Sequence, residues 1–99
     1  MTKEKRAGVR AGVSLPVRWD GLSGLHESRI EDIGMGGCFV NTKGLVQLGE
    51  SVSLQIMLPT GRWVPLRGKI TSFQPGIGFG VVFHPLSDSD KDVFGMMFV

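Results

Sequence analysis

Apolar and polar residues alternate along most of the chain, in short runs separated by glycine and proline. In the clearest run, residues 52–58, one set of alternating positions is aliphatic and the other is occupied by Ser53, Gln55 and Met57. A period of two is typical of β-strands that bury one face. The same reasoning predicts a strand in each of six ranges: 13–19, 25–33, 39–42, 52–58, 63–73 and 79–83.

Two of these strands contain irregular positions. Pro16 cannot donate a hydrogen bond to a neighbouring strand, so it indicates an edge strand or a bulge. Ile30 breaks the alternation of Leu25 and Ile33, which indicates a bulge or a shift of register. In a regular strand, Glu31 and Asp32 would point to opposite faces.

Near the C-terminus the apolar spacing becomes helical. Ser87 and Asp90 resemble a capping box at the start of a short helix. The residues that share its apolar face are Val93, Phe94, Met97 and Phe98. We therefore expect an all-β fold of six antiparallel strands followed by one short C-terminal α-helix. Closure of the strands into a barrel removes exposed strand edges, and the spacing contains no βαβ unit of a parallel nucleotide-binding sheet.

The size and charge of the chain limit its domain organisation. Ninety-nine residues form one domain. Residues 1–12 lack apolar periodicity and carry four of the basic residues, so we expect a flexible basic arm over 1–12 and a barrel over 13–99. The arm is either a solvated tail or a segment that folds onto an anion. The net charge of only +2 argues against a nucleic acid polymer as the partner.

The reactive side chains do not suggest an enzyme. A lone Cys38 excludes a disulfide within the chain and fits a reducing compartment, where we expect it to be a buried strand residue. His26 and His84 are isolated from other metal ligands and are predicted on the surface or in turns. We expect no cofactor. The sequence has no signal peptide and no apolar run of membrane-spanning length, which predicts a cytoplasmic protein without membrane insertion.

Two short motifs suggest a binding site. Arg6 and Arg10 flank Gly8, which lets the chain bend so that both guanidinium groups converge on one anion. The second motif is Asp-Ile-Gly-Met-Gly-Gly over residues 32–37. Asp32 accepts hydrogen bonds from a guanine edge or from the arginines, or it caps the turn. Backbone amides at the glycines can approach a ligand closely.

Taken together, these motifs resemble the PilZ family, bacterial receptor domains for cyclic di-GMP. The family pattern is Arg-x-x-x-Arg followed by Asp/Asn-x-Ser-x-x-Gly, and this chain has Gly34 at the serine position. The resemblance extends over nearly the whole chain, through Leu15-Pro16-Val17-Arg18-Trp19 and Gly78-Phe79-Gly80-Val81-Val82-Phe83. It implies a six-stranded antiparallel PilZ-type barrel with a closing helix.

The resemblance also implies a set of ligand-binding residues. Arg6 and Arg10 would clamp the nucleotide, Asp32 and the glycine turn would hold a guanine, and Lys5 is associated with binding of a stacked nucleotide dimer. The complete predicted set is Lys5, Arg6, Arg10, Asp32, Gly34, Gly36 and Gly37. The missing serine hydroxyl at Gly34 removes one neutral hydrogen bond, about 0.5–1.5 kcal/mol, or roughly two- to tenfold in affinity.

The predicted function is therefore a stand-alone cyclic di-GMP receptor, either a monomer or a homodimer, that relays the signal to an unidentified downstream protein in motility or biofilm regulation. The alternative is a degenerate PilZ-type adaptor that binds proteins without the nucleotide. A small barrel that binds nucleic acid is a third reading, against which the modest charge argues.

Overall fold

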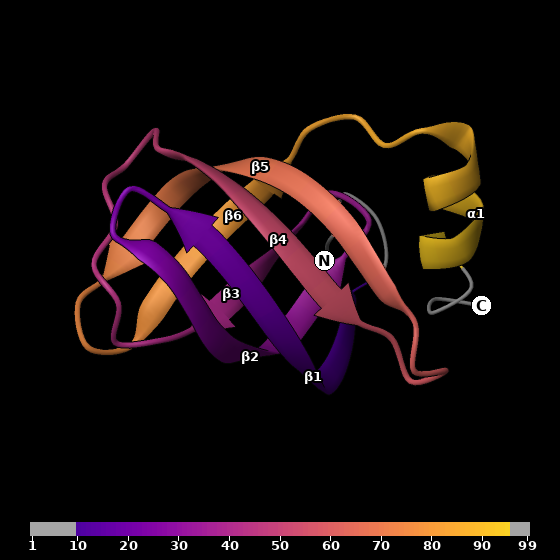
Figure 1. Cartoon of the computed structure of the whole chain (residues 1–99), viewed down its shortest axis with the longest axis horizontal. Coiled ribbons are helices and arrows are strands. Elements are labelled where there is room, and N and C mark those ends of the chain that lie inside the picture. Colours follow the sequence, from indigo (N-terminus) through magenta and orange to yellow (C-terminus); the bar gives the residue numbers. More distant parts are fainter. Residues whose placement is uncertain (1–9, 96–99) are drawn as a thin grey trace, which may run out of the picture.

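Six strands account for most of residues 10–95, the range that the computed structural model describes. They are β1 (Arg10–Gly21), β2 (Gly24–Gly34), β3 (Gly37–Asn41), β4 (Ser51–Met57), β5 (Trp63–Gln74) and β6 (Gly78–Phe83), followed by helix α1 (Asp88–Gly95). All neighbouring strands are antiparallel, and they close into a barrel in the order β1-β2-β3-β6-β5-β4 (Figure 1). The prediction of a six-stranded antiparallel barrel is thus confirmed.

The start of β1 differs from the predicted boundary between arm and barrel. Arg10 lies opposite Gly34, and Gly12 lies opposite Asp32, in the ladder between β1 and β2. Residues 10–12 are therefore paired strand rather than flexible arm, because the ladder gives their backbone N–H and C=O groups hydrogen-bond partners. Lys5 and Arg6 lie outside the described residues, as do Met97 and Phe98 of the predicted helical face.

The barrel interior holds the apolar side chains of the alternating pattern. Trp19 is completely buried, and its indole ring stacks on His26 at 4.2 Å and meets the edge of Phe79 at 4.9 Å between centroids. Its indole N–H donates to the Ser28 hydroxyl at 3.1 Å. His26 is half-buried against this ring, so the prediction of a surface or turn histidine is corrected there. Cys38 is buried in β3 as expected.

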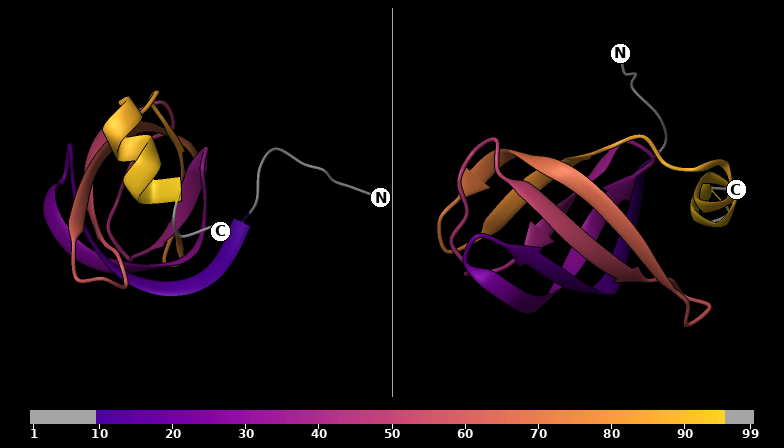
Figure 2. Two further views of the ribbon diagram at one scale, coloured as in Figure 1. Left: turned by 90° about the vertical axis from the view of Figure 1, so that its right-hand side faces the viewer. Right: turned by 45° about the horizontal axis from the view of Figure 1, so that its top comes forward.

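The segment between β3 and β4 covers one end of the barrel. Val46 is buried there, and the carboxylate of Glu50, only 8% exposed, accepts hydrogen bonds from the backbone N–H groups of Leu22 at 2.7 Å and Gln47 at 2.8 Å. These bonds fasten the β1–β2 hairpin to the covering segment. Helix α1 lies at the opposite end, across the barrel opening (Figure 2).

Strand irregularities distinguish the barrel wall from a regular ladder. Pro16 pairs with Arg29 of β2 but lies outside the ladder with β4, which begins at Val17. The register of β1 against β2 shifts between Gly12 and Leu15, just before the proline, so the irregularity expected at Pro16 is present. The bulge expected near Ile30 is present as a register shift between Ile30 and Asp32. A third shift lies in β5, where it affects the outer surface described next.

Candidate functional site

The strand ladder brings the end of the first predicted motif against the second. Arg10 faces Gly34 and Gly12 faces Asp32 across the pairing of β1 with β2. Two segments separated by a full hairpin in the sequence therefore lie side by side on the barrel. The pairing fixes the backbone position from which the Arg10 side chain leaves the strand.

A single row of residues crosses five strands of the barrel wall at this position. Each residue of the row is the direct pairing partner of the next one on the neighbouring strand, starting in β1 and continuing through β2, β3 and β6 to β5. The members of the row, in order, are Gly12, Asp32, Phe39, Gly80 and Ser72. Because glycines lack side chains, the row presents a carboxylate, an aromatic ring and a hydroxyl separated by gaps.

The members of this row in β2, β3, β6 and β5 line a hollow of about 400 Å³ on the outer wall. Its lining residues are Asp32, Gly36, Gly37, Cys38, Phe39, Thr71, Ser72, Gly80, Val81 and Val82. Three of the seven predicted site residues, Asp32, Gly36 and Gly37, thus line one surface feature. Gly34 does not line it; this glycine is buried in the strand opposite Arg10.

Bulges place the polar groups of the hollow on the outside of the barrel. Glu31 and Asp32 are both exposed, so the expectation that they point to opposite faces is wrong. The extra residue at the β2 register shift rotates the backbone and leaves both side chains in solvent. The β5 shift between Ile70 and Ser72 does the same for Thr71 and Ser72.

Phe39, Thr71 and Ser72 were not among the predicted site residues. The sequence did contain a signal for the two hydroxyl residues, because Thr71 and Ser72 interrupt the alternation of apolar and polar residues after Ile70. Glu31 and Asp32 interrupt it in the same way after Ile30. Nothing in the sequence pairs β5 with β2, which are separated around the barrel by β3 and β6.

The two glycines of the turn have different surroundings. A Cβ atom on Gly37 would press into the backbone carbonyl oxygen of Val81 on the neighbouring strand β6. A Cβ atom on Gly36 would meet nothing within 4 Å, and Gly36 does not have a positive φ. The fold therefore requires glycine at position 37, whereas at position 36 the absence of a side chain leaves open space in the hollow.

The chemistry of the lining suits a polar, partly aromatic ligand. Asp32 is the only charged residue among the lining residues, and it offers hydrogen-bond acceptors to N–H groups. Phe39 is half-buried and gives a flat apolar surface on which a base can stack. Thr71 and Ser72 add hydroxyl groups that donate and accept. Positive charge for an anionic ligand must come from outside this lining.

Other kinds of site find little support in the described part of the chain. Within residues 10–95 no group of three or more His, Cys, Asp or Glu side chains is placed to hold a metal ion. Among the helices that the structure describes, none has the length and apolar character needed to cross a membrane.

Comparison with known families agrees with this geometry. A family model described as the PilZ domain matches residues 4–97, which is nearly the whole chain. The chain belongs to the PilZ domain family. PilZ domains are generally cyclic di-GMP receptors or adaptors, and they act by binding and regulation rather than by catalysis. The match includes the segment with Lys5, Arg6 and Arg10 as well as the hollow.

Two solved structures are similar to this PilZ domain. The Bacillus subtilis inhibitor of motility, MotI/DgrA, superposes with a TM-score of 0.81 and 21% identity, over 95% of this chain and 49% of that protein. The PilZ domain of CeSA from a cellulose-synthesizing bacterium gives a TM-score of 0.69 and 22% identity, over 90% of this chain and 98% of that domain. The chain thus spans about half the length of MotI/DgrA. At these identities the likeness shows the fold, and no curated protein matches the sequence.

Proposed function

We propose that this PilZ domain is a cyclic di-GMP receptor. The observation that carries the proposal is the strand register, which sets Arg10 opposite Gly34 and Gly12 opposite Asp32 beside a hollow lined by Asp32, Gly36 and Gly37. Arg10, at the end of the first motif, thus pairs with the strand that carries the second motif, although the two are distant in the sequence.

Each part of the site has a chemical role in the proposal. The Asp32 carboxylate accepts two N–H groups of a guanine edge, the kind of charge-assisted pair that is about twice as strong as a neutral one. The Phe39 ring supports the base. Arg6 and Arg10 supply the positive charge that the lining of the hollow lacks and bind the phosphates bidentately.

Calorimetric titration of cyclic di-GMP into the purified chain tests the proposal. We expect a dissociation constant in the micromolar range or below, about −8 kcal/mol, and loss of binding in the Arg6→Ala/Arg10→Ala variant. Cyclic di-AMP, which has no guanine edge, is the matched ligand control and should bind much more weakly. Absence of heat and of a thermal shift at millimolar cyclic di-GMP would refute the receptor function.

The same titration tests the role assigned to Lys5. A stoichiometry near two nucleotides per chain is expected if Lys5 supports a stacked nucleotide dimer. Lys5→Ala should then reduce the stoichiometry toward one while the first nucleotide still binds. A stoichiometry of one in the parent chain would contradict this role without affecting the receptor proposal.

A second candidate is the degenerate adaptor, which binds a protein without the nucleotide. The observation that favours it is Gly34, which replaces the serine of the family pattern and removes a hydroxyl from the second motif. In that case the Arg6→Ala/Arg10→Ala variant should leave the partner interaction unchanged. The receptor proposal predicts instead that the partner responds to the nucleotide and that the variant abolishes the response.

The proposal also includes the general biological process in which the receptor acts. The similar protein MotI/DgrA is described as an inhibitor of motility, and CeSA comes from a cellulose-synthesizing bacterium. Regulation of motility or biofilm formation through a protein partner is consistent with both. Swimming and matrix assays of a deletion strain, complemented with the parent chain or the double arginine variant, distinguish the two processes.

A further inference from the structure

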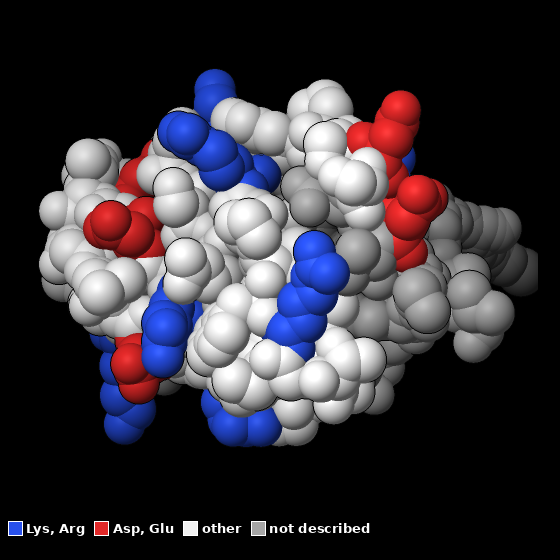
Figure 3. All heavy atoms as spheres, turned by 45° about the vertical axis from the view of Figure 1, so that its right-hand side comes forward, with Lys and Arg blue, Asp and Glu red and all other residues white. Residues whose placement is uncertain are grey.

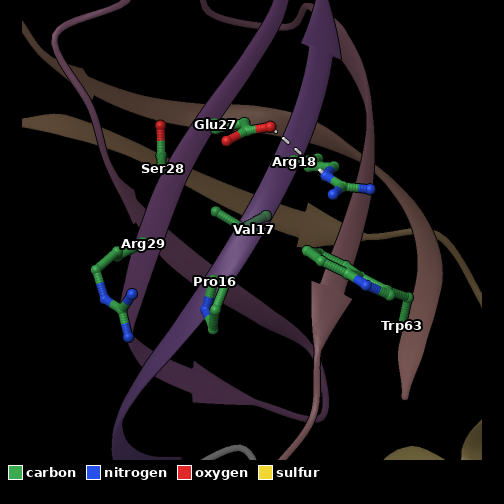
Figure 4. A pocket seen from close by; sticks show the side chains of 7 residues that line it. All are labelled: Pro16, Val17, Arg18, Glu27, Ser28, Arg29 and Trp63. Atoms are coloured by element: carbon green, nitrogen blue, oxygen red, sulfur yellow. Dashed lines mark ion pairs between the residues drawn. The ribbon is translucent and has the colours of Figure 1, made fainter. Parts of the chain in front are cut away.

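A second hollow lies on a different part of the barrel wall. It has a volume of about 350 Å³ and is lined by Pro16, Val17, Arg18, Glu27, Ser28, Arg29 and Trp63. No residue lines both this hollow and the one beside Asp32. Figure 4 shows β1 at Pro16 and Val17 as the floor, with Arg29 on one side and Arg18 with Trp63 on the other.

Arg29 is held in place by a residue of the neighbouring strand. Its Nε donates to the Ser14 hydroxyl at 2.9 Å, and its Nη2 donates to the Ser14 carbonyl oxygen at 3.0 Å. These bonds use two of the five N–H donors of a guanidinium group. The remaining N–H donors of Arg29 make no hydrogen bond to another residue of the part of the chain that the structure describes, so none of these residues competes with an outside acceptor for them.

Arg18 is oriented by an aromatic ring and by an acid. Its guanidinium carbon lies 4.3 Å from the centre of the Trp63 ring, and its Nε lies 3.7 Å from the Glu27 carboxylate. The side chains of Arg18 and Glu27 are 46% and 79% exposed, so their ion pair is weak. A competing carboxylate can therefore replace Glu27, while the ring keeps the guanidinium group in position.

We propose that this hollow, which we call the Arg18–Arg29 hollow, is a docking site for an acidic peptide segment of a protein partner. Charge complementarity identifies the occupant: two fixed guanidinium groups flank an apolar floor, and guanidinium groups bind carboxylates bidentately. Their fixation lowers the conformational entropy lost on binding. A segment with two carboxylates and an apolar or aromatic residue between them matches Arg18, Arg29 and the floor at Pro16 that lies between them.

The charge distribution argues against a nucleic acid as the occupant. Figure 3 shows one face of the molecule, on which basic and acidic side chains are interspersed with uncharged surface. Separate cations suit individual carboxylates better than the continuous charge of a nucleic acid.

The Arg18–Arg29 hollow is also connected to the proposed nucleotide site through β1. Ser14, which holds Arg29, lies in the register shift between Gly12 and Leu15, and Gly12 is the partner of Asp32. Order imposed on the first residues of β1 by a nucleotide would extend directly to the residue that positions Arg29. This step rests on the proposed function, whereas docking of the acidic segment does not require the nucleotide.

Selection of peptides from a phage-displayed random heptapeptide library on the purified chain, without nucleotide, tests the proposal. We expect the selected peptides to be enriched in sequences with two Asp or Glu residues flanking an apolar one. A selected peptide is then synthesised together with its counterpart in which Gln and Asn replace the acids. Its binding is followed by tryptophan fluorescence, with a Trp63→Phe variant to separate the half-buried indole of Trp63 from the buried indole of Trp19.

Variants that each remove one charge test which side chains bind the acidic peptide. Arg18→Gln and Arg29→Gln should each weaken peptide binding about ten- to hundredfold, the effect of one charge-assisted contact. Arg67→Gln, an exposed arginine of β5 outside this hollow, is the matched control and should have little effect. Glu27→Gln should strengthen binding several-fold, because it removes the competing carboxylate. Melting temperatures of all variants should remain near that of the parent chain.

Defined results would overturn the proposal. The first is that the selected peptides are not enriched in acidic residues. The second is that the peptide and its amide counterpart bind equally well. The third is that Arg18→Gln, Arg29→Gln and Arg67→Gln lose the same amount of peptide affinity. An unchanged Trp63 fluorescence on addition of the peptide would also overturn it. Failure of the nucleotide titration alone would refute the receptor function and leave the docking site supported by its own measurements.

Discussion

The adjacent glycines of the second motif allow a direct separation of structural and ligand-binding roles. Gly37 pairs with Val82, and a Cβ atom at Gly37 would overlap the carbonyl oxygen of Val81. This neighbour is backbone within the barrel ladder, so it cannot rotate away as a flexible side chain would. Gly37→Ala therefore requires β3 to move from β6, whereas Gly36→Ala adds a methyl group in open space.

The expected magnitude follows from this overlap. Overpacking against a fixed neighbour costs roughly 1–3 kcal/mol, and we expect Gly37→Ala to lower the free energy of unfolding by about 2 kcal/mol. For a domain of this size, about 2 kcal/mol corresponds to a fall in melting temperature of roughly 8–16 °C. Gly36→Ala should leave stability unchanged or raise it by up to about 1 kcal/mol, because alanine reduces the entropy of the unfolded chain.

Urea unfolding of the parent chain and the two variants, followed by circular dichroism and tryptophan fluorescence, measures these differences. The nucleotide titration is then repeated on Gly36→Ala, which we expect to fold normally and to bind cyclic di-GMP less tightly, because its methyl group occupies the hollow. Equal stability of the two variants, or a Gly37→Ala variant within about 0.5 kcal/mol of the parent chain, would refute the assignment of Gly37 to the fold.

Three further predictions address the barrel end and the hollow. Glu50→Ala should lower the free energy of unfolding by about 3 kcal/mol in urea titrations, because two N–H groups lose a charged acceptor; an unchanged midpoint would contradict this. Gly34→Ser should tighten cyclic di-GMP binding about two- to tenfold by calorimetry, and Gly34→Ala, which adds no hydroxyl, should not. Gly80→Ala places a Cβ atom 2.6 Å from the Ser72 hydroxyl. The variant should keep its melting temperature but bind the nucleotide about tenfold more weakly, because the displaced hydroxyl loses one hydrogen bond to the ligand. Full affinity in this variant would exclude Ser72 from the site.

Much of the barrel could be predicted because the alternation of apolar and polar residues arises within each strand and is visible in the local sequence. Burial of one face of a strand requires a period of two, and that period is visible in the sequence over β4 without any knowledge of its neighbours. The bulge at Ile30 could be predicted for the same reason, since an extra residue interrupts the period. The position of β1 in the ladder was missed by three residues, because Arg10, Ala11 and Gly12 carry no apolar periodicity and are ordered by pairing with β2.

The candidate site was predictable in part. Asp32 and the glycine turn follow from the resemblance to a family pattern, and the structure places Asp32, Gly36 and Gly37 around one hollow. The contributions of Phe39 and Ser72 depend on which strands are neighbours and on the register between them. Neither can be read from a single sequence, because strand pairing is set by contacts between distant segments.

By itself the sequence determined the strands, their alternating faces, the turns and the two motifs, since these depend on interactions between residues close in the chain. Only the tertiary structure decided that Gly37 is required by the neighbouring backbone while Gly36 opens a hollow. It also decided that Arg18 and Trp63 meet on a second part of the wall, because barrel closure pairs β1 with β4, which in turn pairs with β5. Closure satisfies every strand edge at once, and that condition belongs to the whole chain rather than to any segment of it.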